Sequence, residues 1–340
     1  MAEYRRDVFC EWEFLKSFND AQCTGMSEEA EYLYFELRKF LKRSHLLLDK
    51  RFETCRAEIK TPTDPTFRLL KQATEGQLHI DWADKDGFEI KDNKKERLKV
   101  VVLSNNKGLC NLYQQKFGIV VLSPGCWKTE EEAKRHHYLF RDCGSCIIGE
   151  SSYSWKDILR SEYQLAYCNT MVLIDNHILK NLKNLEELLD AILPPENTDY
   201  TREYVFYCTI ITAKDKNNSE RNDWKNYSKL VKTIKKLRPD LEFKFDIYVE
   251  QQSSSNTFHD RYLLTNNVMI TSGYGFGPLK VGKTSIHIWH PGIQNISDVC
   301  DDEYAAVLAR IKKSVIESTS QGSWKHYSEG PCENRLIIEE

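Results

Sequence analysis

The stretch LKVVVLSNNKGLCNLYQQKFGIVVLSPG, residues 98–125, decides the fold class of this chain. It contains a short apolar run at 100–103, apolar residues at helical spacing (Leu109 and Tyr113), and a second apolar run at 119–122. Short, continuous apolar runs are typical of strands that are buried on both faces of a parallel sheet. Strand, helix and strand in this order predict a βαβ unit, in which the helix joins two parallel strands.

Strands and helices also alternate in the second half of the chain. Apolar runs and period-two alternation predict strands at 171–174, 204–212, 243–249 and 285–290. Helical periodicity predicts helices at 182–192, 223–237 and 299–316. This alternation defines the α/β class. We therefore expect two α/β domains, over 1–150 and 151–320, followed by a loosely ordered tail at 321–340.

The segment before the βαβ unit gives weaker signals. Residues 1–60 are expected to be mainly helical, because EEAEYLYFELRKFLKRSHLLL, 28–48, places Tyr32, Phe35, Leu37 and Phe40 near helical spacing. Residues 61–97 are polar and rich in turn signals, which predicts irregular structure.

The composition is that of a globular protein. Hydrophobic residues make up 41% of the 340 residues, which excludes wholesale disorder. Lys and Arg number 48 against 51 for Asp and Glu, so the overall charge indicates no polyanionic partner. The first residues lack the apolar core of a signal peptide, and no run resembles a transmembrane segment. We expect a cytoplasmic protein whose eleven cysteines are reduced and mostly buried.

One motif suggests a nucleotide site, but its context argues against that function. GPLKVGKTS, 277–285, matches the pattern G-x-x-x-x-G-K-[ST] of nucleotide-binding loops. Such a loop needs a helix directly after it, because the amides at the helix N-terminus hold the phosphates. Here Ile286 and Ile288 alternate with His287 and Trp289, which predicts a strand. We interpret the match as a flexible loop between two strands.

The segment TFHDRYLLTNNVMITSG, 257–273, carries the residues best suited to chemistry. Asn266 and Asn267 separate two apolar runs, which predicts a hairpin. His259 and Arg261 are two residues apart on the first strand and should project from one face. An imidazole beside a guanidinium can bind an anion such as phosphate. The second strand ends in hydroxyls and amides that could close around the same phosphate: Thr271, Ser272 and Gly273. A half-exposed strand with ordinary polar residues is the alternative interpretation.

This segment resembles the motif of the phospholipase D superfamily, His-x-Lys followed by an Asp and a small pair. His259, Arg261 and Asn266 fall on the His, Lys and Asp of that motif. The HDR form resembles most the phospholipase-D-like domain at the C-terminus of microtubule-interacting-and-trafficking proteins and its bacterial relatives. The resemblance covers roughly 150–320 and implies a mixed sheet flanked by helices. It also implies phosphodiester cleavage that needs no metal, with His259 as the nucleophile and Arg261 stabilising the phosphoryl charge.

Two departures from the superfamily pattern limit what the resemblance implies. Arg261 in place of Lys keeps phosphate binding, whereas Asn266 in place of Asp removes a carboxylate that supports the site. Superfamily enzymes use a second motif's His as the acid, and this chain has one motif, so catalysis implies a homodimer. One hypothesis is a DNA or RNA nuclease of a bacterial antiviral defence or toxin system, acting with a partner protein. The other is a non-catalytic module that binds phosphate, nucleic acid, lipid or a partner protein.

The N-terminal half resembles a PIN-type nuclease domain over roughly 1–125. DVFCEWEFLKSF, 7–18, would be its first strand and turn, with Glu11 at the leading acidic position and Glu13 nearby. The resemblance implies Mg²⁺ or Mn²⁺ held by carboxylates. The expected third carboxylate falls on Asn106, so the metal site would be depleted. A general α/β domain with a polar turn is the alternative.

Two further groups of residues, one of Cys and His and one of Lys, each have a functional and an ordinary structural interpretation. A four-ligand structural Zn²⁺ set can be drawn from Cys126, His136 (or His137), Cys143 and Cys146. Buried cysteines beside a surface His pair are the alternative. A basic stripe on the expected helix at 223–237 would suit nucleic acid or anionic lipid: Lys225, Lys229, Lys232 and Lys236. A solvated amphipathic face explains the same spacing.

Overall fold

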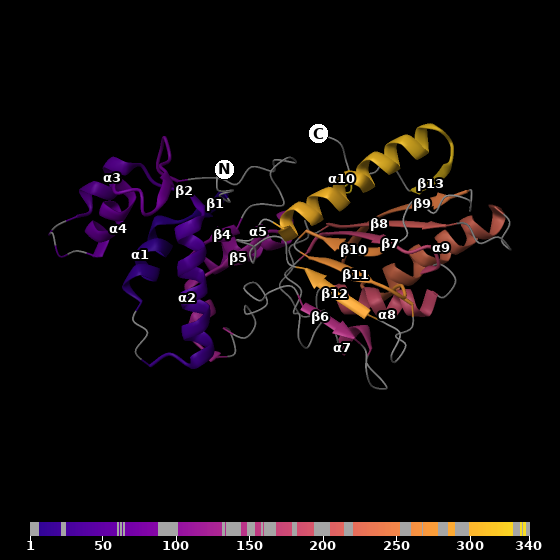
Figure 1. Cartoon of the computed structure of the whole chain (residues 1–340), viewed down its shortest axis with the longest axis horizontal. Helices are drawn as coiled ribbons and strands as arrows, with labels where there is room; N and C mark the ends of the chain where they lie inside the picture. The colour runs from indigo at the N-terminus through magenta and orange to yellow at the C-terminus, as the bar shows by residue number, and fades with distance from the viewer. Residues whose placement is uncertain are drawn as a thin grey trace. The chain divides into compact units, whose positions relative to one another are not determined.

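The computed structural model describes residues 7–21, 25–59, 61, 63, 65–87, 101–130, 133, 144–147, 154–157, 159, 168–178, 182–193, 205–213, 220–251, 260–266, 268–277, 285–289, 299–328, 334 and 336–337. These residues form two compact units, unit 1 from 7 to 133 and unit 2 from 144 to 337. Each unit has its own sheet with helices packed on it, so the α/β class is confirmed (Figure 1). None of the described helices has the length and apolar character that crossing a membrane requires.

Unit 1 is built on a five-stranded parallel sheet in the order β3-β2-β1-β4-β5. Its strands are β1 (Asp7–Cys10), β2 (His45–Leu48), β3 (His79–Asp81), β4 (Val101–Leu103) and β5 (Val120–Leu122). Its helices are α1 (Trp12–Asp20), α2 (Glu28–Arg43), α3 (Phe52–Ala57), α4 (Pro65–Thr74), α5 (Lys107–Phe117) and the short η1 (Pro124–Trp127). The predicted βαβ unit is therefore confirmed as β4, α5 and β5.

The strand order of unit 1 reverses at β1. The chain adds β2 and β3 on one side of β1 and then continues with β4 and β5 on the other side. Because all five strands are parallel, the loops that follow β1 and β4 leave the same edge of the sheet on either side of this reversal. Open α/β sheets bind ligands at such a position.

Unit 2 is built on an eight-stranded mixed sheet in the order β13-β9-β8-β7-β10-β11-β12-β6. Its strands are β6 (Gly144–Ile147), β7 (Thr170–Ile174), β8 (Val205–Ala213), β9 (Glu242–Glu250), β10 (Arg261–Thr265), β11 (Met269–Ser272), β12 (Ser285–Trp289) and β13 (Trp324–Ser328). Its helices are α7 (Trp155–Asp157), α8 (Leu182–Ile192), α9 (Glu220–Leu237) and α10 (Val299–Ser320). The central strands β7, β8 and β9 are parallel, and every other pair is antiparallel.

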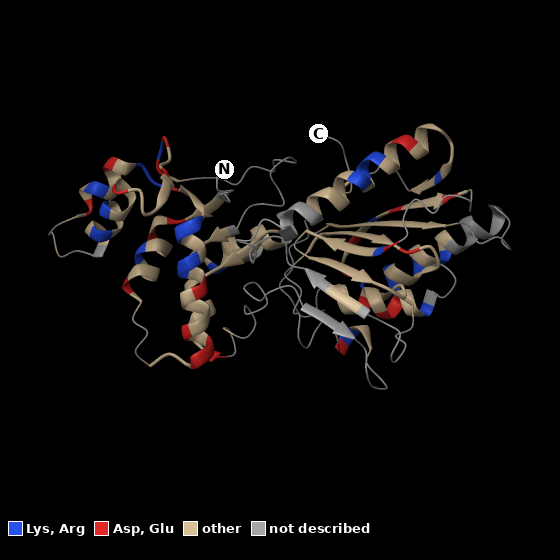
Figure 2. Ribbon diagram, in the orientation of Figure 1, with Lys and Arg blue, Asp and Glu red and all other residues tan. Residues whose placement is uncertain are grey.

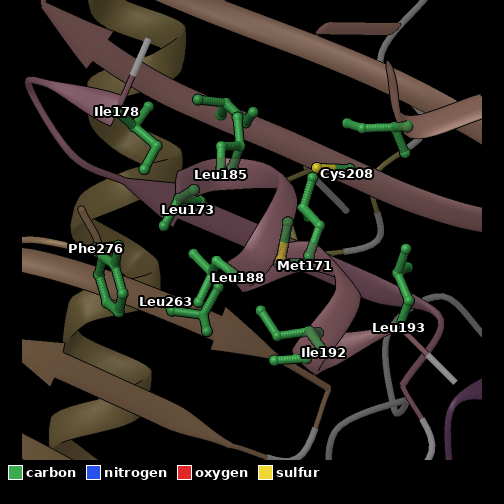
Figure 3. Close-up of a cluster of buried hydrophobic side chains, with 14 of the residues drawn as sticks. Met171, Leu173, Ile178, Leu185, Leu188, Ile192, Leu193, Cys208, Leu263 and Phe276 are labelled. Atoms are coloured by element: carbon green, nitrogen blue, oxygen red, sulfur yellow. The ribbon is translucent and has the colours of Figure 1, made fainter. Parts of the chain in front are cut away.

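The core of unit 2 lies between its sheet and two of its helices. Within unit 2, α8 and α9 cover one face of the sheet and α10 covers the other (Figure 1). Leu185 and Leu188 of α8 pack against Leu173 of β7 and Leu263 of β10, and all four are fully buried (Figure 3). Burying an aliphatic side chain contributes roughly 1.5–3 kcal/mol, so this layer holds β7 and β10 in place.

The structure differs from the sequence prediction in four segments. Residues 45–48, expected as helix, form β2, because pairing with β1 and β3 buries Leu46 and Leu48. The region expected to be irregular contains α4 and β3. Residues 144–147, expected in the first domain, form β6, which pairs with β12 of unit 2. Residues 324–328, expected in a loose tail, form β13, which pairs with β9.

Candidate functional site

The predicted hairpin is confirmed and brings Arg261 to one edge of the unit 2 sheet. β10 begins at Arg261, and its antiparallel partner β11 ends at Ser272, which is the residue opposite Arg261. β7, on the other side of β10, is also antiparallel to it and ends at Ile174, opposite Tyr262. The start of β10 therefore lies between the ends of β7 and β11.

The guanidinium of Arg261 is bonded to backbone and not to a carboxylate. Arg261 Nη1 donates a hydrogen bond of 3.1 Å to the carbonyl oxygen of Gly273, and the side chain is partly exposed. In the described part of the chain, no Asp or Glu forms an ion pair with this guanidinium. A guanidinium has five N–H donors in a fixed fork and stays charged at any ordinary pH. Arg261 can therefore still bind an anion.

The turn after β11 is held in one conformation beside this guanidinium. Ser272 Oγ donates a hydrogen bond of 2.6 Å to the carbonyl oxygen of Gly275. The Phe276 N–H donates one of 2.7 Å to Asp175 Oδ2, and Asp175 is 3% exposed. Gly275 has φ +95°, a backbone conformation that favours glycine. Ser272 and Gly273 therefore lie beside Arg261, but the Ser272 hydroxyl is buried and already bonded.

Sequence reasoning missed Asp175, whose carboxylate holds this turn in place. Asp175 directly follows β7 and also accepts a 2.8 Å hydrogen bond from the His177 N–H. The signal that could have found it is its place, since polar residues at the end of a buried central strand line the edge where loops meet.

A second missed residue, Asn184 of α8, lies near Gly277 at the end of this turn. The Asn184 side chain is 8% exposed, and its Nδ2 has no hydrogen-bond partner in the described part of unit 2. This Nδ2 lies 3.8 Å from the position that a Cβ on Gly277 would take. It is therefore an amide donor near the turn whose hydrogen-bonding capacity is not used.

The structure does not bring Asn266 to Arg261. Asn266 follows β10 at the end opposite Arg261 and is 2% exposed. Its Oδ1 accepts hydrogen bonds from the N–H groups of Asn169 and Thr170, and its Nδ2 donates to Asn169 Oδ1. The prediction that Asn266 belongs to the catalytic set is not supported by this geometry, because the amide joins the β10–β11 turn to the start of β7.

Thr271 is also separated from the candidate site. It pairs with Tyr262, and neighbouring residues of a strand project from opposite faces, so Thr271 lies on the face away from Arg261. The hydroxyl of Tyr262 on that face donates to Asp260 Oδ2 and accepts from Arg310 Nη2. His259 lies outside the described residues.

In unit 1, the structure places Asp49, which the sequence did not indicate, close to Glu11. Glu11 directly follows β1, and its Oε2 accepts a 2.8 Å hydrogen bond from the Asn105 N–H in the loop after β4. Asp49 directly follows β2, and its Oδ1 accepts a 2.7 Å bond from the Trp12 N–H. Burial raises the pKa of Asp49, the bond from Trp12 opposes this rise, and the charge of Glu11 adds to it. The two carboxylates therefore follow neighbouring strands, β1 and β2, and Asp49 binds the N–H of the residue that comes after Glu11.

The other acidic and amide positions of the expected metal site have different roles. Asn106, the expected third position, caps α5, because its Oδ1 accepts a bond from the Leu109 N–H. Glu13 pairs with Lys16 and Lys50. Throughout the described ranges, no group of three or more His, Cys, Asp or Glu is arranged to hold a metal ion.

Glu58 pairs with the same two lysines as Glu13, namely Lys16 and Lys50, on the surface of unit 1. Its carboxylate accepts hydrogen bonds of 3.0 Å from Lys50, 3.1 Å from Lys16 and 3.1 Å from the Trp12 indole. Burial opposes a fall in the pKa of Glu58, but the three donors outweigh it and lower the pKa to about 2. The folded state therefore favours the ionised form of Glu58.

Glu58→Gln is expected to lower the free energy of unfolding of unit 1 by about 1 kcal/mol at pH 7. This value is smaller than the free energy to which the full pKa shift corresponds, because the side chain is 30% exposed and solvent screens the ion pairs. Since the folded pKa is lowered, the contribution is complete above the ordinary pKa of 4.5 and is lost as the pH falls toward 2. Urea titrations from pH 7 to pH 2.5 should show wild type and variant converging below pH 4.5. Glu53→Gln, at an exposed position in α3, is the control, and a difference that stays constant down to pH 2.5 would contradict the assignment.

The predicted zinc set lies mostly outside the described residues. Cys126 is buried in η1 of unit 1. His136 and Cys143 lie outside the described residues, and of Cys146 only the backbone, in β6 of unit 2, is described.

Three of the four lysines in the predicted basic stripe on α9 are exposed to solvent. Lys229, Lys232 and Lys236 are exposed, whereas Leu230 and Ile234 are fully buried in the core. Figure 2 shows several Lys and Arg positions in blue along α9. The side chain of Lys225 lies outside the described residues. The face is therefore positively charged and open to solvent.

Comparisons with known proteins identify no family for this chain. No protein-family model matches it, and no curated protein matches its sequence. Among solved structures, the C-terminal lobe of a budding yeast Argonaute is 9% identical, covering 90% of this chain and 71% of that chain, with a TM-score of 0.14. A TM-score this low does not establish a shared fold.

Proposed function

We propose that unit 2 binds and cleaves a phosphodiester of nucleic acid, with Arg261 as the residue that holds the phosphate. The observation that carries the proposal is a partly exposed guanidinium bonded to the Gly273 carbonyl, with no carboxylate partner in the described part of the chain. A guanidinium has five N–H donors, so one bond to a carbonyl leaves others for a phosphate oxygen, which is a suitable partner. The backbone of the turn at 273–275 would approach the same anion.

His259, two residues before Arg261 in the sequence, is the proposed nucleophile. An imidazole nitrogen attacks phosphorus, a P–N bond forms, and the P–O bond to the leaving nucleoside breaks. The His259 of a second copy gives its proton to the leaving oxygen, and water later cleaves the P–N bond. This mechanism requires a homodimer and no metal. A role as an effector of bacterial antiviral defence stays a prediction.

The basic face of α9 supports nucleic acid as the partner. Lys229, Lys232 and Lys236 are exposed on one side of a helix in the same unit as Arg261. Lysines that neutralise successive phosphates contribute affinity that does not depend on sequence. A long polyanion could contact both this face and the Arg261 site.

The test is incubation of wild type with single- and double-stranded DNA and RNA in EDTA, beside His259→Ala and Arg261→Ala. Wild type should cleave at least one substrate. His259→Ala should lose activity to below detection, and Arg261→Ala should lose about 100-fold, because a positioned charge-stabilising donor contributes 10²–10³ in rate. Arg310→Ala is a matched control, because it removes an arginine on the other face of the sheet.

Three other outcomes would contradict the proposal, reduce it to binding alone, or change its mechanism. Cleavage by Arg261→Ala at the wild-type rate would contradict the proposal. Binding that depends on Arg261, without cleavage by any variant, would reduce the proposal to a phosphate-binding module. A strictly monomeric wild type that still cleaves would remove the second copy from the mechanism.

A metal-dependent site in unit 1 is the second candidate, because Glu11 and Asp49 follow the neighbouring parallel strands β1 and β2 at one edge of the sheet. Burial, together with the charge of Glu11, raises the pKa of Asp49, and a divalent cation would favour its ionised form. Mg²⁺ is often bound by one or two carboxylates together with substrate phosphates. Glu11 and Asp49 would hold the ion, which would supply Lewis-acid activation of a phosphate. Cleavage that EDTA abolishes and His259→Ala leaves unchanged would favour this site.

A further inference from the structure

We infer that the Arg261 site takes an unpaired nucleotide whose base stacks on Tyr274, so its substrate class is single-stranded nucleic acid and not phospholipid. This inference rests on the proposed function, since it names the substrate of the same site. It is drawn from the position, exposure and support of one aromatic side chain.

Tyr274 is attached to the peptide group that Arg261 contacts. Arg261 Nη1 donates to the carbonyl oxygen of Gly273, and this carbonyl shares one planar peptide unit with the N–H of Tyr274. The Tyr274 side chain is 46% exposed and lies between two glycines, Gly273 and Gly275. The guanidinium of Arg261, at the start of β10, therefore contacts the peptide group that precedes the exposed ring of Tyr274.

The backbone that carries Tyr274 is held on both sides. The Gly275 N–H donates to the Ser272 carbonyl oxygen and the Ser272 hydroxyl donates to the Gly275 carbonyl oxygen, so the turn is closed across Tyr274. The next N–H, that of Phe276, binds the buried Asp175 carboxylate. Phe276 itself is fully buried against Trp155, whose indole donates to the Gly277 carbonyl oxygen. An aromatic ring on a fixed backbone can bind a flat ligand at low ordering cost.

Tyr274 differs from the other exposed large hydrophobic residues of the described chain. Single exposed apolar side chains are common and need no functional explanation. The others lie on helices α2, α4 and α10: Tyr32, Phe35, Phe67 and Ile316. Tyr274 lies in a turn next to a guanidinium that has no carboxylate partner in the described residues.

The chemistry of the two groups together selects the ligand class. Every nucleobase has a flat π face that stacks on an aromatic ring, and it is joined through its sugar to a phosphate. Phospholipid headgroups offer the phosphate without a flat ring. In a duplex both faces of a base are already stacked, so a base must be unpaired to reach Tyr274.

Binding assays with two fluorescent strands of equal length test the inference, one of oligodeoxythymidylate and one abasic. All variants are made in the His259→Ala background, so that the strands are not cut. Tyr274→Ala should weaken binding of the thymidylate strand about 5- to 150-fold, the range for loss of one stacked base, and leave the abasic strand unchanged. Tyr274→Phe keeps the ring and should bind both strands as the parent does. Phe35→Ala, which removes an exposed ring in unit 1, should have no effect on either strand.

The outcomes separate this inference from the proposed function. If Arg261→Ala weakens both strands but Tyr274→Ala changes neither, or weakens both equally, the stacking role is wrong and the phosphate site stands. If Arg261→Ala changes neither strand, or the parent protein binds neither, the phosphate site fails and the stacking role fails with it. Tighter binding to phosphatidylinositol phosphate vesicles than to the thymidylate strand would also overturn the assignment of substrate class.

Discussion

A chain that ends after Ser320 is expected to lose about 5 kcal/mol or more of the free energy of unfolding of unit 2. The truncation removes β13, which pairs with β9 over five residues, and with it Trp324, which is 4% exposed. It also removes Leu336 and Ile337, which are 1% and 4% exposed. Burying a large apolar side chain contributes roughly 1.5–3 kcal/mol, so three such losses account for this figure. Urea unfolding of the full and shortened chains, followed by circular dichroism, measures it.

A chain that ends after Ser328 is the matched control for this truncation. It keeps β13 and loses Asn334, which is fully buried and donates hydrogen bonds to the Met171 carbonyl oxygen and to Thr209 Oγ1. An intermediate loss of stability is expected. In the chain that ends after Ser320, β9 also becomes an unpaired edge, so increased aggregation should accompany the loss. Equal stability of all three chains would contradict the structure of this region.

The sequence did not predict β13, because the information that forms this strand is not local. Residues 324–328, WKHYS, contain few of the strong strand formers, and their partner β9 lies about eighty residues earlier in the chain. His326 shows how the pairing is supported, since its Nε2 lies 2.7 Å from Asp246 Oδ1 and its ring stacks on Tyr248. These contacts exist only once β9 is in place.

Local patterns, in contrast, predicted most of the elements correctly. The βαβ unit at 98–125 was predictable because apolar runs and helical spacing lie side by side in the sequence. The hairpin of β10 and β11 was predictable from Asn266 and Asn267 between two apolar runs. Helix and strand could not be separated at 45–48, since a short apolar run fits either and only its place in the sheet decides.

The part of the candidate site that depends on the local hairpin was also predictable from the sequence. Ser272 and Gly273 lie beside Arg261 because the hairpin register puts them there, and a hairpin register follows from the turn. Asp175 could not be assigned to the site, because its closeness to Phe276 depends on β7 being the neighbour of β10. Asp49 was missed for the same reason, since its meeting with Glu11 depends on the order of the strands.

Gly275→Ala is expected to lower the free energy of unfolding of unit 2 by about 3 kcal/mol. The backbone at Gly275 has φ +95°, which costs a residue with a side chain about 1–3 kcal/mol. An added Cβ would also lie 2.7 Å from Asp175 Oδ2 and 3.6 Å from Arg261 Cδ. The carboxylate cannot easily move away, because it binds the N–H groups of Phe276 and His177. For a unit of this size the loss corresponds to a fall in melting temperature of about 6–12 °C.

Gly322→Ala separates the two causes of this loss. Gly322, in the turn between α10 and β13 of the same unit, has φ +71°, but an added Cβ there would have no atom within 4 Å. Its loss should therefore be only about 1 kcal/mol, the cost of the backbone conformation alone. The difference between the two variants measures how firmly Asp175 is held against the turn, and with it how rigidly the turn presents the peptide that Arg261 contacts. If both variants lose the same stability, Asp175 moves freely, and the fixed turn on which the phosphate site depends does not exist.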